Sequence, residues 1–295
     1  MTAGTAHPSR GTIFLEQARV ISQRAFAARQ FVLRLAAPRC AAAATPGSFV
    51  HLTCDPGVPM RRPLSIMRTD PRAGWIELLY KVVGSGLAAL GTRKPGDELS
   101  VLGPVGRSFT ARPERPRALL VGGGVGIPPM VFLAESLRKQ TATPWKPLVL
   151  MGSEVPFPFT ARPSTLIVPG MPAGTIACMP LLEEWGVPSR LASGADFPGC
   201  FPGFVTGLAE AWLGSLGAGE LGEVEIFACG PTPMLKATAA LARRYQLPCQ
   251  VSLEEYMACG VGGCAGCAVE VRGTEGPAMK RVCVDGPVFD ASTVF

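Results

Sequence analysis

The sequence predicts a fold of the β + α/β class in three parts: an antiparallel β-barrel, a parallel α/β domain and a small cysteine-rich C-terminal domain. Three observations support this prediction. Residues 11–112 consist of short apolar runs separated by glycine and proline, which is typical of antiparallel strands. Residues 117–250 alternate continuous apolar runs with helical patterns, as a buried parallel sheet requires. Residues 251–295 hold four clustered cysteines.

The strands of the barrel are expected in six apolar runs of the first part. These runs are RVISQ, FVLRL, SFVHL, PLSIM, WIELLYKVV and ELSVLG. Glycine and proline between the runs end each strand and turn the chain back. The charged, proline-bearing segment ARPERPR at residues 111–117 then predicts a linker.

The α/β part opens with the segment ALLVGGGVGIPPMVFLAESLRKQ, which predicts a strand, a glycine turn and a helix. Met130, Leu133, Ala134 and Leu137 would share one face of that helix. Further strands are expected near residues 147–152, 165–170, 223–230 and 248–253, and helices at residues 204–216 and 232–245. Apart from the strand near 165–170, the stretch 156–203, which is rich in proline, glycine and alanine, predicts no clear element.

Composition and charge narrow the functional class. The chain has 295 residues, of which 47% are hydrophobic, yet it contains no apolar run long enough for a membrane span. The N-terminal segment MTAGTAHPSR lacks the apolar block of a signal peptide, so a cytoplasmic protein without membrane contact is expected. Residues 251–295 carry a net charge of −3, which leaves +9 on the remainder of the +6 chain. The positive charge outside residues 251–295 suits phosphate-bearing ligands. The basic residues are dispersed and aromatic residues are sparse, which argues against nucleic-acid binding.

The spacing of the clustered cysteines is that of an iron–sulfur site. Four residues separate Cys259 from Cys264, two separate Cys264 from Cys267, and Cys283 follows after fifteen more. The first three match the plant-type ferredoxin spacing, so the sequence predicts a 2Fe-2S cluster held by four thiolates. The glycines of this loop would let backbone N–H groups point at the sulfur atoms.

A structural zinc site is the alternative, since four cysteines also suit tetrahedral zinc. Zinc cysteines usually come as two short-spaced pairs, whereas three of these share one glycine-rich loop, which favours the cluster. A disulfide framework is not expected in a reducing compartment. The scattered cysteines are therefore interpreted as small buried hydrophobic residues: Cys40, Cys54, Cys178, Cys200 and Cys249.

Three short motifs of the barrel part outline a site for FAD. An arginine guanidinium can fork onto a diphosphate, and a nearby hydroxyl can face a flavin ring nitrogen. An aromatic ring and a cation at a strand end could cover a nucleotide, and free N–H groups at a helix start would meet phosphate. The three motifs are residues 61–65, 79–81 and 84–87.

Two glycine turns of the α/β part outline a site for a nicotinamide dinucleotide. Each joins a strand end to a proline-led helix, and two such turns at neighbouring strand ends would form one crevice. Neither has the spaced GxGxxG pattern of an ordinary Rossmann site. The residues expected to bind NAD are Gly122, Gly123, Gly124, Gly126, Cys229, Gly230 and Pro231. Cys229 is expected at the mouth of the crevice near the nicotinamide, where it could serve chemistry or packing.

The motifs RRPLS, GGGVGIPP and ACGPTPM resemble those of the ferredoxin reductase superfamily, which carries FAD on a barrel and a nicotinamide nucleotide on an α/β domain. The tail, SLEEYMACGVGGCAGCAVEV followed by KRVCVDGPVFD, is similar to the electron transfer subunits of NAD-dependent dihydroorotate dehydrogenases of pyrimidine synthesis. The resemblance implies domains at residues 11–112 for FAD, 117–250 for NAD and 251–295 for the cluster. It also implies that the residues that bind FAD are Arg62, Pro63, Leu64, Ser65, Leu79, Tyr80, Lys81, Gly86 and Leu87. Two positions depart from the pattern: Leu87 replaces a usual threonine, and Tyr256 replaces a common basic residue.

The same resemblance implies the activity and the partner. Electrons from a partner dihydroorotate dehydrogenase subunit that holds FMN would pass through the 2Fe-2S cluster and FAD to NAD+, in an assembly expected to be a heterotetramer. Two alternatives remain open at this stage. One is the small flavin and iron–sulfur subunit of another NAD(P)H oxidoreductase, of the ferredoxin or sulfur-reducing hydrogenase type. The other is a non-enzymatic zinc module. The preference for NAD over NADP is not determined by the motifs.

Overall fold

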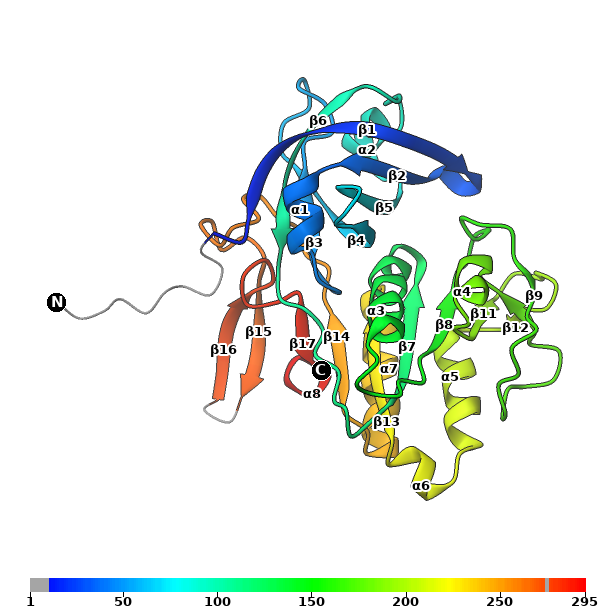
Figure 1. Ribbon diagram of the computed structural model, residues 1–295. Coiled ribbons are helices and arrows are strands. Elements are labelled where there is room, and N and C mark those ends of the chain that lie inside the picture. Colours follow the sequence, from blue (N-terminus) through cyan, green and yellow to red (C-terminus); the bar gives the residue numbers. More distant parts are fainter. Residues whose placement is uncertain (1–10, 274–275) are drawn as a thin grey trace.

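The computed structural model describes residues 11–273 and 276–295 (Figure 1). Residues 1–10, where the sequence predicts no signal peptide, lie outside these ranges. The closed barrel lies at the top of Figure 1, the α/β sheet with its helices lies below it, and a C-terminal hairpin lies to one side. The predicted β + α/β class in three parts is therefore confirmed.

The barrel closes through six antiparallel strands in the order β1-β2-β5-β4-β3-β6. Alternation puts Leu33 and Leu35 of β2 and Leu78 of β5 into its fully buried interior. The strands are β1 (Phe14–Phe26), β2 (Gln30–Ala36), β3 (Phe49–Leu52), β4 (Arg62–Asp70), β5 (Trp75–Lys81) and β6 (Glu98–Val105). Three short helices lie between them: η1 (Ala27–Arg29), α1 (Pro38–Ala43) and α2 (Gly84–Leu90).

The second part is a seven-stranded sheet in the order β12-β11-β8-β7-β13-β14-β17, parallel except for its last strand. Its strands are β7 (Arg117–Gly123), β8 (Leu148–Gly152), β11 (Ser189–Ser193), β12 (Phe201–Pro202), β13 (Val224–Cys229), β14 (Cys249–Ser252) and β17 (Val288–Asp290). Helix α3 (Ile127–Lys139) covers one face, and α5 (Val205–Gly214) and α7 (Thr232–Tyr245) cover the other. The remaining helices are η2 (Gly124–Gly126), α4 (Pro180–Glu184) and α6 (Ala218–Leu221).

The strand predicted at residues 165–170 is wrong. Ser164 and Thr165 are instead tied to Glu183 of α4 by side-chain hydrogen bonds of 2.8 Å each, and Ile167 is 91% exposed. The sheet position beside β8 is taken by β11, from the stretch that predicted no element. A separate small sheet forms from β9 (Arg162–Pro163) and β10 (Ala177–Cys178).

The C-terminal part shares a sheet with the α/β part. Strands β15 (Ala268–Gly273) and β16 (Gly276–Arg281) form a hairpin. The chain then returns, and β17 pairs antiparallel with β14 before α8 (Ala291–Val294) packs on the same core. The domain boundary expected at residue 250 therefore falls within β14, the strand that pairs with β17.

The chain at the start of the predicted linker is fastened to the sheet by hydrogen bonds to Gln250 and to the buried Glu225. The Thr110 N–H donates to Oε1 of Gln250 at 3.0 Å, and Nε2 of Gln250 donates to the Thr110 carbonyl at 2.6 Å. Glu225, which is fully buried, accepts from the Arg112 N–H and from Gln250, at 3.0 Å each. These bonds hold the barrel and the sheet in one orientation.

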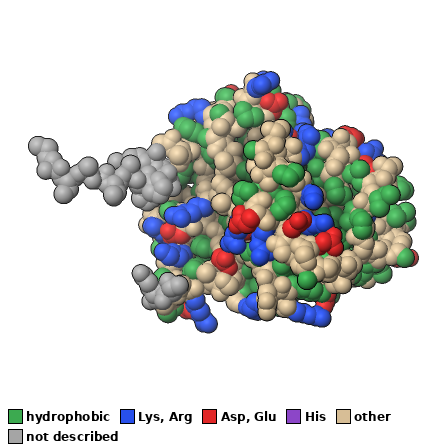
Figure 2. All heavy atoms as spheres, turned by 60° about the horizontal axis from the view of Figure 1, so that its bottom comes forward, with side chains coloured by type: hydrophobic (Ala, Val, Ile, Leu, Met, Phe, Trp, Pro, Cys, Tyr) green, Lys and Arg blue, Asp and Glu red, His purple; other side chains and the backbone are tan. Residues whose placement is uncertain are grey.

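Within the described ranges, every helix is too short or too polar to span a lipid bilayer. Figure 2 shows the underside of the molecule, where Lys and Arg side chains are interspersed with Asp and Glu side chains. Ion pairs of this kind join Arg117 to Glu220 and Glu223.

Candidate functional site

The four cysteines of the C-terminal part lie in one loop region as two pairs. The Sγ atoms of Cys267 and Cys283 are 3.3 Å apart, and both residues are buried. Cys259 and Cys264 form the second, more exposed pair, in which the Cys264 side chain hydrogen-bonds to that of Cys259. All four are free thiols. The structure therefore brings together the four residues that the spacing selected.

Backbone N–H groups of the loop point at the sulfur atoms, as the glycine content predicts. The Val261 N–H lies 3.5 Å from Sγ of Cys259, and the Gly266 N–H lies 3.4 Å from Sγ of Cys264. Burial alone would raise the pKa of the Cys259 thiol, but N–H groups of Val261, Cys264 and Gly263 lower it to about 6. This loop is thus prepared to hold a thiolate, the form that binds metal.

The pairing of the four thiols fits a site with two irons. The Sγ atoms of one pair lie 3.3 Å apart, and a side-chain hydrogen bond joins the other pair. A structural zinc site needs four ligands around one point, whereas a 2Fe-2S cluster needs four thiolates shared between two irons. Two separate pairs of thiols therefore fit a 2Fe-2S cluster.

The cysteine loop is docked on the barrel through the outer face of β3. Phe49 packs with Cys267, Cys283 and Val282 in one buried cluster. Two residues further along, the fully buried ring of His51 lies against the loop, where a Cβ added to Gly260 would be 2.7 Å from its Nδ1 atom. Burial, and then the charge of Arg61, lower the pKa of His51 below its usual value.

Strand β4, which pairs with β3, carries the first FAD motif. Phe49 lies directly opposite Ser65, and His51 lies directly opposite Pro63. Directly paired residues project from the same face of a sheet, so Ser65 and Pro63 share the outer face with the two residues that contact the cysteine loop. The register therefore places the predicted flavin contacts beside the predicted cluster.

Arg62 has the surroundings of an anion-binding residue. Its guanidinium lies over the first turn of α2, where a Cβ added to Gly86 would be 2.8 Å from Nη2. Its hydrogen bonds go to the carbonyls of Met60 and Arg61, and among the described residues it forms no ion pair with a carboxylate. A cation beside free helix N–H groups fits a diphosphate.

Three of the other predicted FAD residues have side chains in or against the core. The ring of Tyr80 is only 1% exposed, stacks on Phe31 at 5.3 Å and donates to Oε1 of Gln23 at 2.9 Å. Alternation along β5 points this ring into the barrel and not toward a nucleotide, and FAD binding at this position stays a prediction. The Leu79 side chain is also buried, while Lys81 is exposed. The Leu87 side chain packs on the barrel core.

The two glycine turns of the α/β part lie together at the carboxyl ends of β7 and β13, where Gly122 pairs with Cys229. They pack against each other closely: a Cβ on Gly126 would lie 2.2 Å from the Cys229 carbonyl oxygen. Met234 covers Gly123 and Gly230, whose added Cβ atoms would lie 2.5 Å from its Sδ and 2.7 Å from its Cε. The glycines are thus already required by packing, and their contact with NAD stays a prediction.

Cys229 is 1% exposed, so its thiol does not line an open crevice. Burial, and then the negative charge of Glu254, raise the pKa of Cys229 above its usual value. A neutral, enclosed thiol supports packing rather than nucleophilic chemistry.

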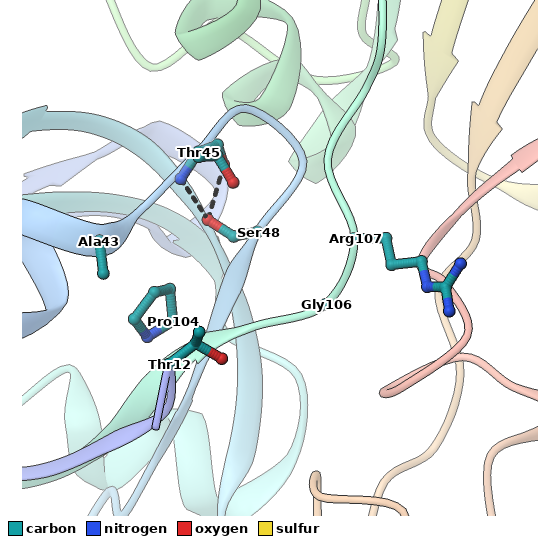
Figure 3. Close-up of a pocket in the computed structure, with 7 residues that line it drawn as sticks. All are labelled: Thr12, Ala43, Thr45, Ser48, Pro104, Gly106 and Arg107. Carbon is teal, nitrogen blue, oxygen red and sulfur yellow. Dashed lines mark hydrogen bonds between the residues drawn. The ribbon is translucent and has the colours of Figure 1, made fainter. Parts of the chain in front are cut away.

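A pocket of about 230 Å³ lies away from these motifs (Figure 3). Thr45 and Ser48 face it from the barrel, while the Arg107 side chain points to the opposite side, toward the C-terminal part. The other lining residues are Thr12, Ala43, Pro104 and Gly106. Nothing in the predicted FAD, NAD or cysteine motifs lines this pocket.

Phe49 and His51 were not among the residues predicted for any site. Both lie in the run SFVHL, which was interpreted only as a barrel strand. The histidine was the available signal, because a titratable residue on an otherwise apolar strand needs a partner.

Comparison with known proteins agrees with this geometry. Residues 254–295 match the family described as the iron–sulfur cluster binding domain of dihydroorotate dehydrogenase B. The chain is 36% identical over 288 residues to the dihydroorotate dehydrogenase B (NAD(+)) electron transfer subunit of Bacillus caldolyticus, covering 95% of this chain and 98% of that protein. The corresponding subunit of Lysinibacillus sphaericus is 31% identical over 287 residues, with the same two coverages.

Solved structures show the same fold. An NADH-dependent reduced ferredoxin-NADP oxidoreductase superposes with a TM-score of 0.74 and 26% identity, over 95% of this chain and 90% of that one. Phthalate dioxygenase reductase, at 16% identity and a TM-score of 0.54, shares the fold over 90% of this chain and 76% of that one. On the full-length similarity, the chain belongs to the family of dihydroorotate dehydrogenase B (NAD(+)) electron transfer subunits.

Proposed function

We propose that this chain passes electrons from a partner dihydroorotate dehydrogenase subunit to NAD+, using a 2Fe-2S cluster and FAD. The observation that carries the proposal is the shared outer face of β3 and β4. Phe49 belongs to one buried cluster with two of the cluster cysteines, Cys267 and Cys283, and its direct partner Ser65 belongs to the flavin motif. One rigid two-strand element thus supports both predicted cofactor sites.

The bound flavin would supply the conversion between single-electron and hydride transfer, which side chains do not provide. The residues of the chain would hold the two cofactors and enclose them. Arg62 and the first turn of α2 would bind the diphosphate, and the N–H groups of the cysteine loop would stabilise the thiolates. Phe49 excludes water from the buried cysteine pair.

The finer assignment of the partner rests on the family resemblance. We propose that the partner holds FMN and that the two kinds of subunit form a heterotetramer. The exposed pair, Cys259 and Cys264, marks the side of the cysteine loop on which electrons can enter. Co-purification of the native complex, with FMN analysis and native mass spectrometry, tests both statements. A complex without FMN would contradict this assignment.

The division of labour gives a direct test. The purified chain is expected to reduce dyes with NADH and to leave dihydroorotate unoxidised, because the chain offers flavin and nicotinamide motifs but no recognised pocket for dihydroorotate. Adding the partner should restore dihydroorotate-dependent reduction of NAD+. Turnover of dihydroorotate by the chain alone would refute the proposal.

Substitution of the exposed Cys264 tests electron transfer through the cluster separately from electron transfer between NADH and the flavin. Cys264→Ala is expected to abolish the visible absorbance of the iron–sulfur cluster, but not that of the flavin, and electron transfer to or from the partner, while NADH-to-dye activity stays within about twofold of the wild type. Cys200→Ala, at a half-buried cysteine outside the loop, is the matched control and should keep both activities. Iron content per chain and the two activities are measured together. Loss of dye reduction in Cys264→Ala would argue for a structural role of the metal site.

The fold also supports a second candidate function. The structure with a TM-score of 0.74 is an NADH-dependent reduced ferredoxin-NADP oxidoreductase, which shares the arrangement of this chain. A subunit of that type would exchange electrons with ferredoxin. Parallel assays with ferredoxin and with the dihydroorotate dehydrogenase partner decide between the two, and the full-length family match favours the latter.

A further inference from the structure

His51 lies where the barrel meets the cysteine loop. In β3, Val50 and Leu52 fill the barrel core, so Phe49 and His51 project from the outer face. Phe49 packs on Cys267 and Cys283, and His51 faces the other end of the loop. The side chain of His51 is fully buried where the barrel and the cysteine loop meet.

The buried ring of His51 lacks hydrogen bonds. Among the described residues, neither ring nitrogen has a partner in hydrogen-bonding geometry, although carbonyls of Cys259, Arg61 and Met257 lie nearby. A buried polar group without a partner costs roughly 1–3 kcal/mol. Either tautomer of the neutral ring carries one N–H, so a donor is held ready at this junction.

The loop is shaped to accept this ring. Gly260 directly follows Cys259 and has a positive φ of 69°. A Cβ at that position would lie 2.7 Å from Nδ1 and 3.1 Å from Cγ of His51, so any larger residue would push the loop off the barrel. The contact therefore joins a cysteine ligand to the strand beside the flavin motif.

We propose that His51 is a positioning residue of the iron–sulfur site, whose ring N–H serves as a hydrogen-bond donor to the sulfur atoms held at Cys259. The inference rests on the proposed function, since it needs a cluster in this loop. Hydrogen bonds to the sulfur atoms raise the reduction potential of such clusters. His51 would thus set the potential of the cluster and fix the loop against β3 and β4.

Isotope labelling of the full chain tests the hydrogen bond without disturbing the fold. The sequence contains two histidines, His7 and His51, and His7 lies outside the described residues. Chain labelled with 15N-histidine is reduced and examined by pulsed EPR. A weak 15N coupling is expected in the wild type and in His7→Ala. No coupling, or the strong coupling of a nitrogen bound to iron, would overturn the inference.

Redox titration tests the consequence. In His51→Leu the one-electron equilibrium of the cluster with a reference dye should shift about tenfold toward the oxidised cluster, which equals about 59 mV. His51→Gln, which restores an N–H donor, should recover most of the shift. Leu52→Val, on the other face of β3, should leave the potential unchanged and controls for loosening of the strand.

The failures of the two proposals are distinguishable. A wild-type preparation without iron refutes the proposed function, whereas an intact cluster that titrates identically in His51→Leu and the wild type refutes only the role of His51. If His51→Leu does not retain iron, the labelled wild type and His51→Gln still give the answer.

Discussion

Arg62 differs from an ordinary surface arginine because its guanidinium is held against a helix start rather than against a carboxylate. Its contacts are the carbonyls of Met60 and Arg61 and the glycine at position 86. An unpaired cation in this setting attracts a phosphate group and can bind it through two parallel hydrogen bonds. The residue is therefore the most testable member of the FAD motif.

We expect Arg62→Ala to weaken FAD binding by about tenfold or more, since a hydrogen bond to a charged group contributes roughly 1.5–3 kcal/mol. Arg62→Lys keeps the charge but loses the forked geometry and should show an intermediate Kd. Fluorescence titration of the flavin-free chain gives the three values. Arg72→Ala, at an exposed position in the turn after β4, is the control. Equal affinity of Arg62→Ala and the control would place the diphosphate elsewhere.

At the level of elements, the glycine turns after β7 and β13 act as one packed unit. Gly126 lies against the backbone of Cys229 and Gly230, so the two turns have no space for a side chain between them. Gly124, two residues away, has a φ of 54°, but a Cβ added to it would have no neighbouring atom within 4 Å. Substitution of Gly126 therefore tests the steric contact between the turns, whereas substitution of Gly124 tests backbone strain.

Gly126→Ala is expected to lower the free energy of unfolding by about 3 kcal/mol or more, because the new methyl group would overlap the Cys229 carbonyl. Gly124→Ala should cost only about 1–2 kcal/mol, the strain of a left-handed alanine. Denaturant unfolding of both variants measures the difference. Equal losses would mean that the two turns shift to admit the methyl group, and that their contact does not require glycine at position 126.

For the whole molecule, the C-terminal part is tied to the sheet as well as to the barrel. Strand β17 pairs with β14, α8 packs on the core of the α/β part, and the Arg107 N–H donates to the Gly286 carbonyl at 2.6 Å. Removing this part would expose the edge of β14 and the outer face of β3. Loss of the cluster and loss of the C-terminal part are therefore different perturbations.

A chain that lacks residues 254–295 should melt at least about 5 °C below the full-length protein, since a chain of this size loses roughly 2–4 °C for each kcal/mol. Full-length Cys264→Ala keeps β17 and should stay closer to the wild type. Scanning calorimetry compares the three proteins, each loaded with FAD. A truncated chain as stable as Cys264→Ala would show that the C-terminal part is independent.

The sequence alone determined the features that local pattern encodes. Cysteine spacing selected the four thiols, and period-two alternation with glycine and proline breaks gave the closed barrel. The two glycine turns were recognised because strand, turn and helix follow each other directly in the chain. Residues far apart in sequence do not enter such patterns.

Only the tertiary structure decided where these local features meet. The sheet positions of β11 and β17, the burial of Tyr80 and Cys229, and the contact of His51 with Gly260 each depend on partners many residues away. A strand pattern shows which residues alternate but not which face meets another domain. The shared outer face of β3 and β4, where the cysteine loop meets the flavin motif, became visible once the chain was folded.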